Sequence, residues 1–414
     1  MFNVSREFAP PFSLISPFFI IGTLFYLIAS LFLPMFGADV SYLDINVIGW
    51  IHLFLLGFVM MIILGAMAQL IPVVLEVGHF SVDFYYLIWP LLGIGTILMV
   101  LGFWLLPNLL PYGGIIVLIA MLIFLADTIM TLRKVEYISL TVKTVAVTNS
   151  FLLLGILIGF AMALGIGAGA GIDITKWLNA HIVLVLGGYV ILTIMGMSLI
   201  LLPMFGLSHG FDEKPINLSF KMMVGGLLLY LLATLFNSKD FQFLSMLDII
   251  GALGLYLYQI WLIYKTRARK EYDIWFKSML FGYFSLALSL PLGFVALMSA
   301  SEFIGISAVW FLIMGFVTFL INGHLYKIIP FLVWFERYSP LVGKESVPML
   351  ADMVPKKEAE YQFWFTAIGT TVAGFGLIFG NSAMFKAGST FIIVGAIFLT
   401  YNVFCMINFG KNRD

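Results

Sequence analysis

Twelve long apolar runs divide this 414-residue sequence, and they constrain its fold more than any other feature. Each is long enough to cross the hydrocarbon core of a membrane, which takes about 20 residues of helix. A composition that is 62% hydrophobic and only 10% charged excludes a soluble domain. The sequence therefore predicts an all-α polytopic membrane protein, with residues 1–414 forming a single domain of twelve transmembrane helices. The runs lie at 12–36, 46–75, 83–106, 112–132, 144–169, 177–205, 218–236, 241–264, 275–299, 308–334, 361–380 and 387–409.

The 21 Lys and Arg residues predict the orientation. If the N-terminus is cytoplasmic, 17 of them fall in cytoplasmic segments and only Lys176, Lys239 and Lys386 fall outside, which follows the positive-inside rule. We therefore predict an integral protein of a bacterial-type inner (plasma) membrane, surrounded by membrane lipid, with both termini in the cytoplasm. The formal net charge of zero gives no indication of nucleic-acid binding. The single cysteine, Cys405, excludes an internal disulfide and an iron–sulfur cluster.

Three of the five histidines lie within apolar runs: His52 in the second, His181 in the sixth and His324 in the tenth. A single histidine in a membrane helix commonly packs or hydrogen-bonds to a neighbouring carbonyl. Three of them on even-numbered helices also fit metal ligation, because neutral imidazole is the commonest metal ligand. The other two, His79 and His209, follow the ends of apolar runs and are predicted to be solvated loop residues.

The residues around these histidines resemble the catalytic subunit (subunit I) of the haem–copper oxidases. The resemblance rests on Trp50-Ile51-His52 with Leu56-Gly57, on Trp177-Leu178-Asn179-Ala180-His181, and on Asn322-Gly323-His324. It implies a subunit I-like helix bundle in which His52 and His324 are the two axial ligands of one low-spin b-type haem. It also implies that His181 is a candidate ligand for a second metal, copper.

Two departures from the family pattern predict that dioxygen reduction is lost. Asn322 stands where the family has the histidine that binds the high-spin haem, and residues 218–236 contain no histidine for copper. Pro17-Phe18-Phe19 and the Trp50-x-His52 element also resemble NnrS-type proteins, relatives linked to haem, copper and nitric oxide stress. The resemblance therefore implies one haem b per chain, used for electron transfer with a quinol or cytochrome as redox partner, or for handling nitric oxide. Whether such a protein is an enzyme stays open.

Two further functions stay open. An ion-coupled secondary transporter could use the buried Asp127, Asp248 and Lys327 as an ion or proton path, because charges inside lipid mark such paths. Lys327 could instead form a structural ion pair with Asp127 or Asp248, or extend toward the inner surface. A copper-handling or assembly factor could use His181 and methionines.

Overall fold

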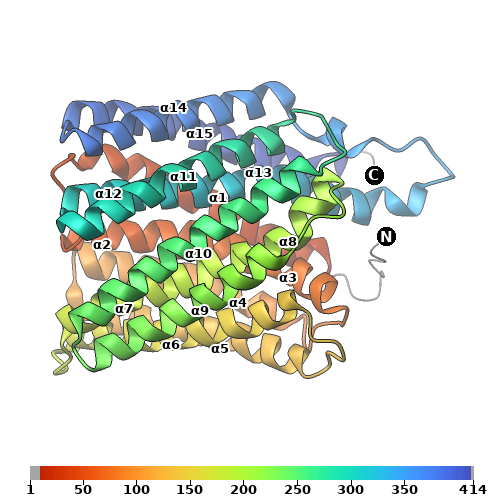
Figure 1. Ribbon diagram of the computed structural model, residues 1–414. Helices are drawn as coiled ribbons and strands as arrows, with labels where there is room; N and C mark the ends of the chain where they lie inside the picture. Colours follow the sequence, from red (N-terminus) through yellow and green to blue (C-terminus); the bar gives the residue numbers. More distant parts are fainter. Residues whose placement is uncertain (1–9, 412–414) are drawn as a thin grey trace. The chain divides into compact units, whose positions relative to one another are not determined.

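The computed structural model describes residues 10–411, which are helical with no strand (Figure 1). The all-α membrane architecture is confirmed: eleven of the described helical segments are long and apolar enough to cross a membrane. The twelfth predicted span is also a helix of 23 residues, α14, and is richer in polar residues than the other eleven. The α-helices are α1 (Phe12–Phe32), α2 (Ile45–His52), α3 (Met61–Leu75), α4 (Phe84–Trp104), α5 (Leu110–Leu132), α6 (Leu140–Ala168), α7 (Ile174–Ile182), α8 (Leu192–Gly206), α9 (Lys214–Leu235), α10 (Lys239–Lys265), α11 (Ile274–Ser299), α12 (Glu302–Trp310), α13 (Thr318–Arg337), α14 (Lys356–Ile378) and α15 (Ser382–Asn408).

Three spans contain a π-helical segment between two α-helices. These segments are η2 (Leu53–Met60), which joins α2 to α3, η4 (Val183–Ile191), which joins α7 to α8, and η5 (Phe311–Val317), which joins α12 to α13. The resulting continuous spans are the second, sixth and tenth, the same three that carry His52, His181 and His324. π-Helical turns are rare in proteins overall, and those that occur are often at functional sites. These three spans are therefore candidates for carrying the functional site.

The contacts divide the chain into two compact units. Unit 1 consists of Leu70–Glu271 and Gly293–Ala300, and unit 2 consists of residues 10–69, Tyr272–Leu292 and residues 301–411. His181 belongs to unit 1, whereas His52 and His324 both belong to unit 2.

A sequence motif repeats in the three π-containing spans. It reads Gly, an aromatic residue and Val, then a second Gly eight residues after the first, then Pro seven residues later. Copies occupy 57–72, 188–203 and 315–330. We did not predict an internal repeat from the sequence, because Gly, Val and Pro are common in membrane helices and the motif is spread over a long stretch.

The two glycines of each copy pack against the preceding span. A Cβ built on any of the six would come within 3 Å of a side chain on that span. The residues contacted are always seven apart, two turns of helix: Phe18 and Phe25 on α1, Thr144 and Phe151 on α6, Ser278 and Ser285 on α11. The same packing thus recurs three times, and glycine is required because the helices approach so closely.

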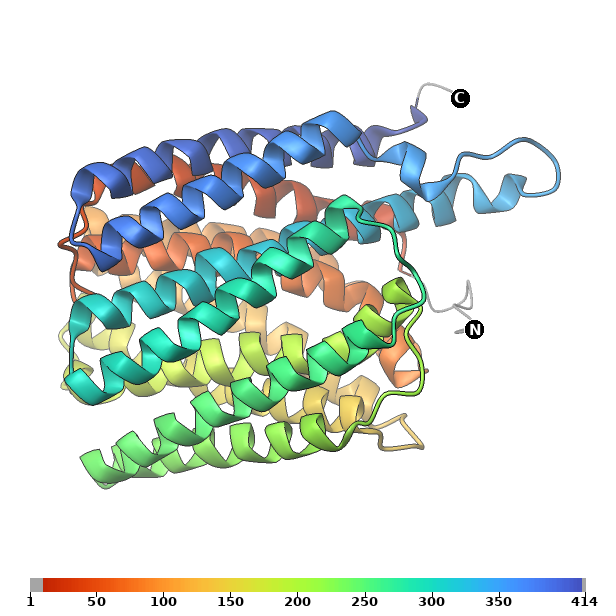
Figure 2. The same cartoon turned by 45° about the horizontal axis from the view of Figure 1, so that its top comes forward.

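The two spans that follow each of these pairs form a close hairpin: α4 with α5, α9 with α10, and α14 with α15. Figure 2 shows α14 and α15 side by side along their lengths. A Cβ at Gly369 of α14 would lie 2.7 Å from the Gly388 carbonyl oxygen of α15, so here too small residues allow the contact. The order of a glycine-packed pair of spans followed by a close hairpin therefore occurs three times along the chain, at 12–132, 140–265 and 274–408.

The described ends of the chain lie at the same end of unit 2. The Phe12 backbone N–H donates to the Glu336 carboxylate at 2.8 Å, and Arg337 Nη1 donates to the Phe409 carbonyl at 2.5 Å. An even number of membrane crossings, such as the twelve predicted, places both ends of a chain on the same side. That both termini face the cytoplasm stays a prediction, and residues 1–9 and 412–414 lie outside the described part of the chain.

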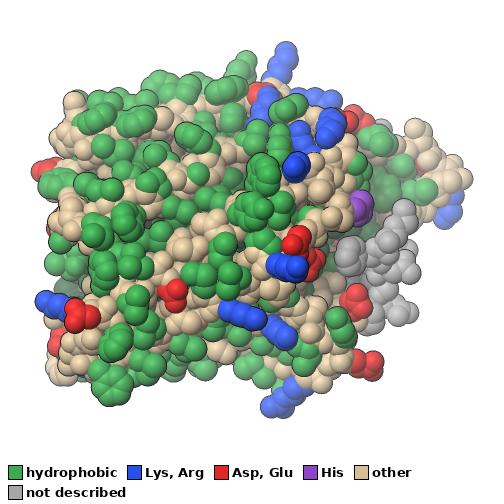
Figure 3. Space-filling view, in the orientation of Figure 1, with side chains coloured by type: hydrophobic (Ala, Val, Ile, Leu, Met, Phe, Trp, Pro, Cys, Tyr) green, Lys and Arg blue, Asp and Glu red, His purple; other side chains and the backbone are tan. Residues whose placement is uncertain are grey.

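Several spans begin earlier than predicted because the residues before the apolar runs are helical as well. α12 begins at Glu302 instead of 308, and α15 begins at Ser382 instead of 387, where the Asn381 side chain accepts from the Met384 N–H. In the face shown in Figure 3, hydrophobic side chains lie along the lengths of the helices, as expected for a surface in lipid.

Candidate functional site

His52 lies at the last position of α2, directly before η2. Its Nδ1 lies 2.8 Å from the Ile48 carbonyl oxygen one turn earlier. The neighbouring Trp50 is fixed by a hydrogen bond from its Nε1 to the Ala29 carbonyl of α1 and stacks on Phe54 at 5.4 Å. The Trp50-x-His52 element is therefore held in a defined position in unit 2.

His324 lies on α13, one residue after the second glycine of the third motif copy. Its Nδ1 lies 2.7 Å from the Leu320 carbonyl oxygen, and its Nε2 is buried. The Trp275 ring of α11 meets the imidazole edge-on at 6.2 Å between centroids. Gly323 makes this approach possible, since a Cβ there would press on Ser278 and Met279 of α11.

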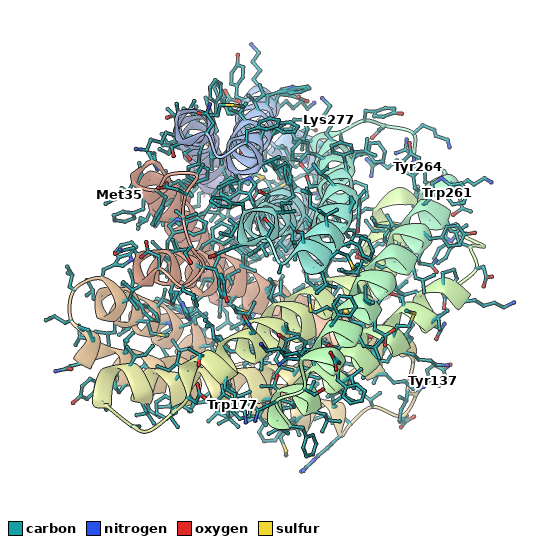
Figure 4. All side chains as sticks on the ribbon, turned by 60° about the vertical axis from the view of Figure 1, so that its left-hand side comes forward. Met35, Tyr137, Trp177, Trp261, Tyr264 and Lys277 are labelled. Carbon is teal, nitrogen blue, oxygen red and sulfur yellow. The ribbon has the colours of Figure 1, made fainter. Side chains whose placement is uncertain are left out.

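His181 lies on α7 in unit 1, and its Nδ1 contacts a neighbouring helix. The acceptor is the Gly155 carbonyl oxygen of α6, at 2.8 Å. A Cβ at Gly159 would lie 2.6 Å from the imidazole ring, so the ring fills the space that this glycine leaves. Figure 4 labels Trp177, one turn earlier on α7.

All three imidazoles share one protonation pattern. A carbonyl oxygen can only accept, so in each ring Nδ1 carries a proton, and in its neutral form each ring has its lone pair on Nε2. Metal-bound histidines typically donate one ring N–H to a carbonyl or carboxylate in this way. The donor chemistry at all three positions therefore fits iron or copper ligation through Nε2.

His52 and His324 lie at different depths. His52 is seven residues after Ile45, where its span begins, and His324 is 22 residues after Glu302, where its own begins. The two starts are level, because the Glu302 carboxylate accepts from Ser41 Oγ at 2.5 Å and from the Tyr42 N–H at 3.1 Å. At 1.5 Å per residue the offset is about 20 Å, more than two imidazoles on opposite sides of one iron can span. Ligation of one haem by both His52 and His324 stays a prediction, and this offset in depth favours a site with one of the two imidazoles over a shared one.

A metal cluster of several side chains is not formed by the described residues: no three His, Cys, Asp or Glu come together in a group that could hold a metal ion. His181 thus supplies one imidazole without a set of such ligands around it in unit 1. Copper ligation by His181 stays a prediction.

Lys327 forms an ion pair, but with a partner that we did not predict. Its Nζ lies 2.6 Å from the Asp273 carboxylate, and not beside Asp127 or Asp248. Asp273 lies just before α11, and its other oxygen accepts from the Phe276 N–H at 2.9 Å. Lys327 also lies over the Trp275 ring, 5.8 Å from its centroid. A sequence signal existed: an Asp directly before an apolar helix is a typical N-cap.

Asp127 is paired within unit 1. The Asp127 carboxylate lies 2.7 Å from His79 Nδ1, with neither side chain exposed, and its other oxygen accepts from the Ser81 N–H at 2.9 Å. The prediction that His79 is solvated is wrong, since the loop after α3 folds back over α5. His209 is exposed, as predicted, and Asp248 is half-buried on α10. Asp127 and Lys327 thus belong to separate pairs, with His79 and Asp273 respectively.

A scan of the chain against protein family models found no match, and a search of curated proteins found none.

Proposed function

We propose that this chain is a haem-binding integral membrane protein that handles a diatomic gas such as nitric oxide, with His324 as the iron ligand. The observation that carries the proposal is the His324 imidazole, deep in its span, with Nδ1–H donated to the Leu320 carbonyl and a buried Nε2. Imidazole of this form is the usual proximal ligand of b-type haem.

The register explains why gas handling is proposed ahead of electron transfer. Low-spin electron-transfer haems need two axial protein ligands, and His52 lies about 20 Å away along the helix axes. A haem with one imidazole ligand keeps a coordination position at which a diatomic gas can bind. In this proposal α11 positions the ligand: Trp275 packs on the imidazole, and the ion pair of Lys327 with Asp273 fixes the next turn of α13.

Ion-coupled transport gains no comparable support. Two of its three proposed residues, Asp127 and Lys327, are held by His79 and Asp273. Many transporters consist of two inverted repeats, whereas this chain repeats the same order of four spans three times, and an even number of spans gives every repeat the same orientation.

The test is the absorption spectrum of the protein purified from haem-supplemented cells, reduced with dithionite, before and after adding nitric oxide or carbon monoxide. We expect a haem spectrum in the unmodified protein that changes with the gas and is lost in His324→Ala. His209→Ala, an exposed imidazole, is the matched control and should leave it unchanged.

His52→Ala separates the two arrangements. If His324 alone ligates the iron, this variant keeps the spectrum and its gas response. If both imidazoles share one haem, the unmodified protein shows a low-spin haem spectrum, and His52→Ala and His324→Ala each remove it. Absence of haem from the unmodified protein, or a spectrum unchanged in His324→Ala, would overturn the proposal.

A further inference from the structure

A buried hydrogen-bond chain joins α13, α14 and α15 within unit 2. Asn402 Nδ2 donates to Tyr326 Oη at 2.9 Å, and Tyr326 Oη donates to Gln362 Oε1 at 3.2 Å. Gln362 Nε2 then donates to Thr366 Oγ1 at 3.1 Å. All four residues are at most 2% exposed. Polar groups this deep in a membrane span cost free energy unless they are hydrogen-bonded. This hydrogen-bond chain is therefore a place where unit 2 concentrates its buried polar groups.

At one end of this hydrogen-bond chain, a side-chain amide oxygen accepts no hydrogen bond from any residue that the structure describes. Asn402 Oδ1 is buried and has no hydrogen-bond partner among the described residues. The same holds for both Oδ1 and Nδ2 of Asn322, a residue that is 0% exposed. Exchanging the two atoms of the Asn322 amide would not help, because a donor and an acceptor are both left without partners.

Asn322 and the Asn402 amide both lie at the face of α13 that carries Tyr326. Asn322 precedes Tyr326 by four residues, so the two share one face of α13. Helix side chains lean toward the helix N-terminus, so the Tyr326 side chain lies over the turn that carries Asn322. Because Asn402 donates to the Tyr326 hydroxyl, its amide lies against this same face of α13.

Asn322 is also particular to its copy of the repeated motif. Seven residues after the first glycine, the other two copies have Leu64 and Met195. The packing of these spans therefore does not require a polar residue at this position, and the amide of the third copy needs an explanation of its own.

We propose that Asn322 and Asn402 bind an ordered water molecule that bridges α13 and α15. The three atoms require a ligand that donates to Asn402 Oδ1 and Asn322 Oδ1 and accepts from Asn322 Nδ2. A water molecule does this with both hydrogens and one lone pair, within the two to four hydrogen bonds that buried waters make. A hard metal cation does not suit the site, because the two amide oxygens are far fewer than the roughly six to eight oxygen ligands that such a cation as Ca²⁺ takes, and a cation cannot accept from the amide N–H. The bridge fixes the rotation of α13 relative to α15.

Thermal unfolding of Asn322→Leu, Asn402→Leu and the double variant tests the bridge. Each single substitution leaves the other amide without its water, so each should lower the unfolding midpoint. The double variant should lose clearly less than the sum of the two, because it leaves neither half of the bridge behind. Asn149→Leu on α6 is the matched control: it is a buried asparagine in unit 1, and its effect should add to that of Asn322→Leu.

A density map of the unmodified protein at a resolution that shows waters gives a second measurement, which holds even if a leucine variant fails to fold. We expect one water within hydrogen-bond distance of the three amide atoms. Strict additivity of the two leucine substitutions, or a map in which the amides meet other groups with no water between, would overturn the proposal. Neither measurement depends on whether haem binds at His324.

Discussion

The hydrogen-bonded pair of His79 with Asp127 in unit 1 and the ion pair of Lys327 with Asp273 in unit 2 each join a carboxylate to a nitrogen group, in different surroundings. Neither side chain of the first pair is exposed, whereas 19% of the Lys327 side chain and 29% of the Asp273 side chain are exposed in the second. When a fully buried group loses its partner, no water can replace that partner. A partly exposed group that loses its partner can hydrogen-bond to water instead. The comparison therefore predicts that burial, more than distance, decides what each pair contributes.

The fully buried pair also holds the loop after α3. Asp127 Oδ1 accepts from the Ser81 N–H, and the Phe80 N–H donates to Thr131 Oγ1 at 2.9 Å. Lys134 Nζ donates to the His79 carbonyl oxygen at 3.0 Å. The loop thus depends on several contacts with one face of α5, and Asp127 is the central acceptor.

Asp127→Leu is the substitution expected to have the largest effect. Removing one member of a buried pair leaves the other buried without a partner, which costs about 3–5 kcal/mol. Unfolding of the detergent-solubilised protein by heat or denaturant measures this loss. Asp248→Leu, at a half-buried carboxylate on α10, is the control and should cost much less. The double variant His79→Phe/Asp127→Leu should recover part of the loss; equal costs for Asp127→Leu and Asp248→Leu would contradict the ranking by burial.

Lys327→Met should have a smaller effect, about 1 kcal/mol, because the pair with Asp273 is partly exposed. Asp273→Asn is the informative companion, since an asparagine oxygen can still accept from the Phe276 N–H but carries no charge. If the ion pair is what matters, the double variant should be no less stable than Lys327→Met alone. A cost for Lys327→Met equal to that for Asp127→Leu would show that exposure does not separate the two pairs.

Most of the fold could be predicted from the sequence, because apolar length and charge distribution specify membrane spans directly. The twelve runs all became helices, with errors at their starts where caps such as Asn381 lie outside the apolar residues. The threefold repeat could have been found from Gly57, Gly188 and Gly315, but its spacing becomes meaningful only when each glycine is seen to pack on the preceding span.

The candidate site was harder to predict, because its geometry depends on register between distant spans. That His52 and His324 differ in depth follows only once Glu302 is seen to contact Ser41 and set the two spans level. Asp273 was not predicted as the partner of Lys327 because it lies in a connecting segment, whereas Asp127 and Asp248 lie inside apolar runs. His79 was misjudged for a related reason: a loop position does not reveal that the loop folds over a buried carboxylate.

A fully exposed carboxylate, Asp173, extends the comparison to its lower limit. Asp173 caps α7: it accepts from Thr175 Oγ1 at 2.7 Å and from the Lys176 N–H at 3.0 Å. The hydrogen bond from Thr175, with that from Lys176, lowers the pKa of the Asp173 carboxyl below its ordinary value of 3.8. A depressed folded-state pKa means that the stabilisation is complete above the ordinary value and is lost as the pH falls through the lower one.

Hydrogen exchange of the Lys176 amide in Asp173→Asn and the unmodified protein measures this smallest effect. An asparagine oxygen also caps a helix but does not titrate in this range. At neutral pH the unmodified protein should protect the Lys176 amide slightly better, because the carboxylate is the stronger acceptor and interacts favourably with the helix N-terminus. Below about pH 3.8 the advantage should begin to decrease, and it should disappear once the pH falls below the lowered pKa of the carboxyl. If the extra protection of the Lys176 amide persists at low pH, the Asp173 cap acts through its shape and not through its charge. The ranking of carboxylates by burial, with Asp127 at the top, would then not extend to exposed carboxylates.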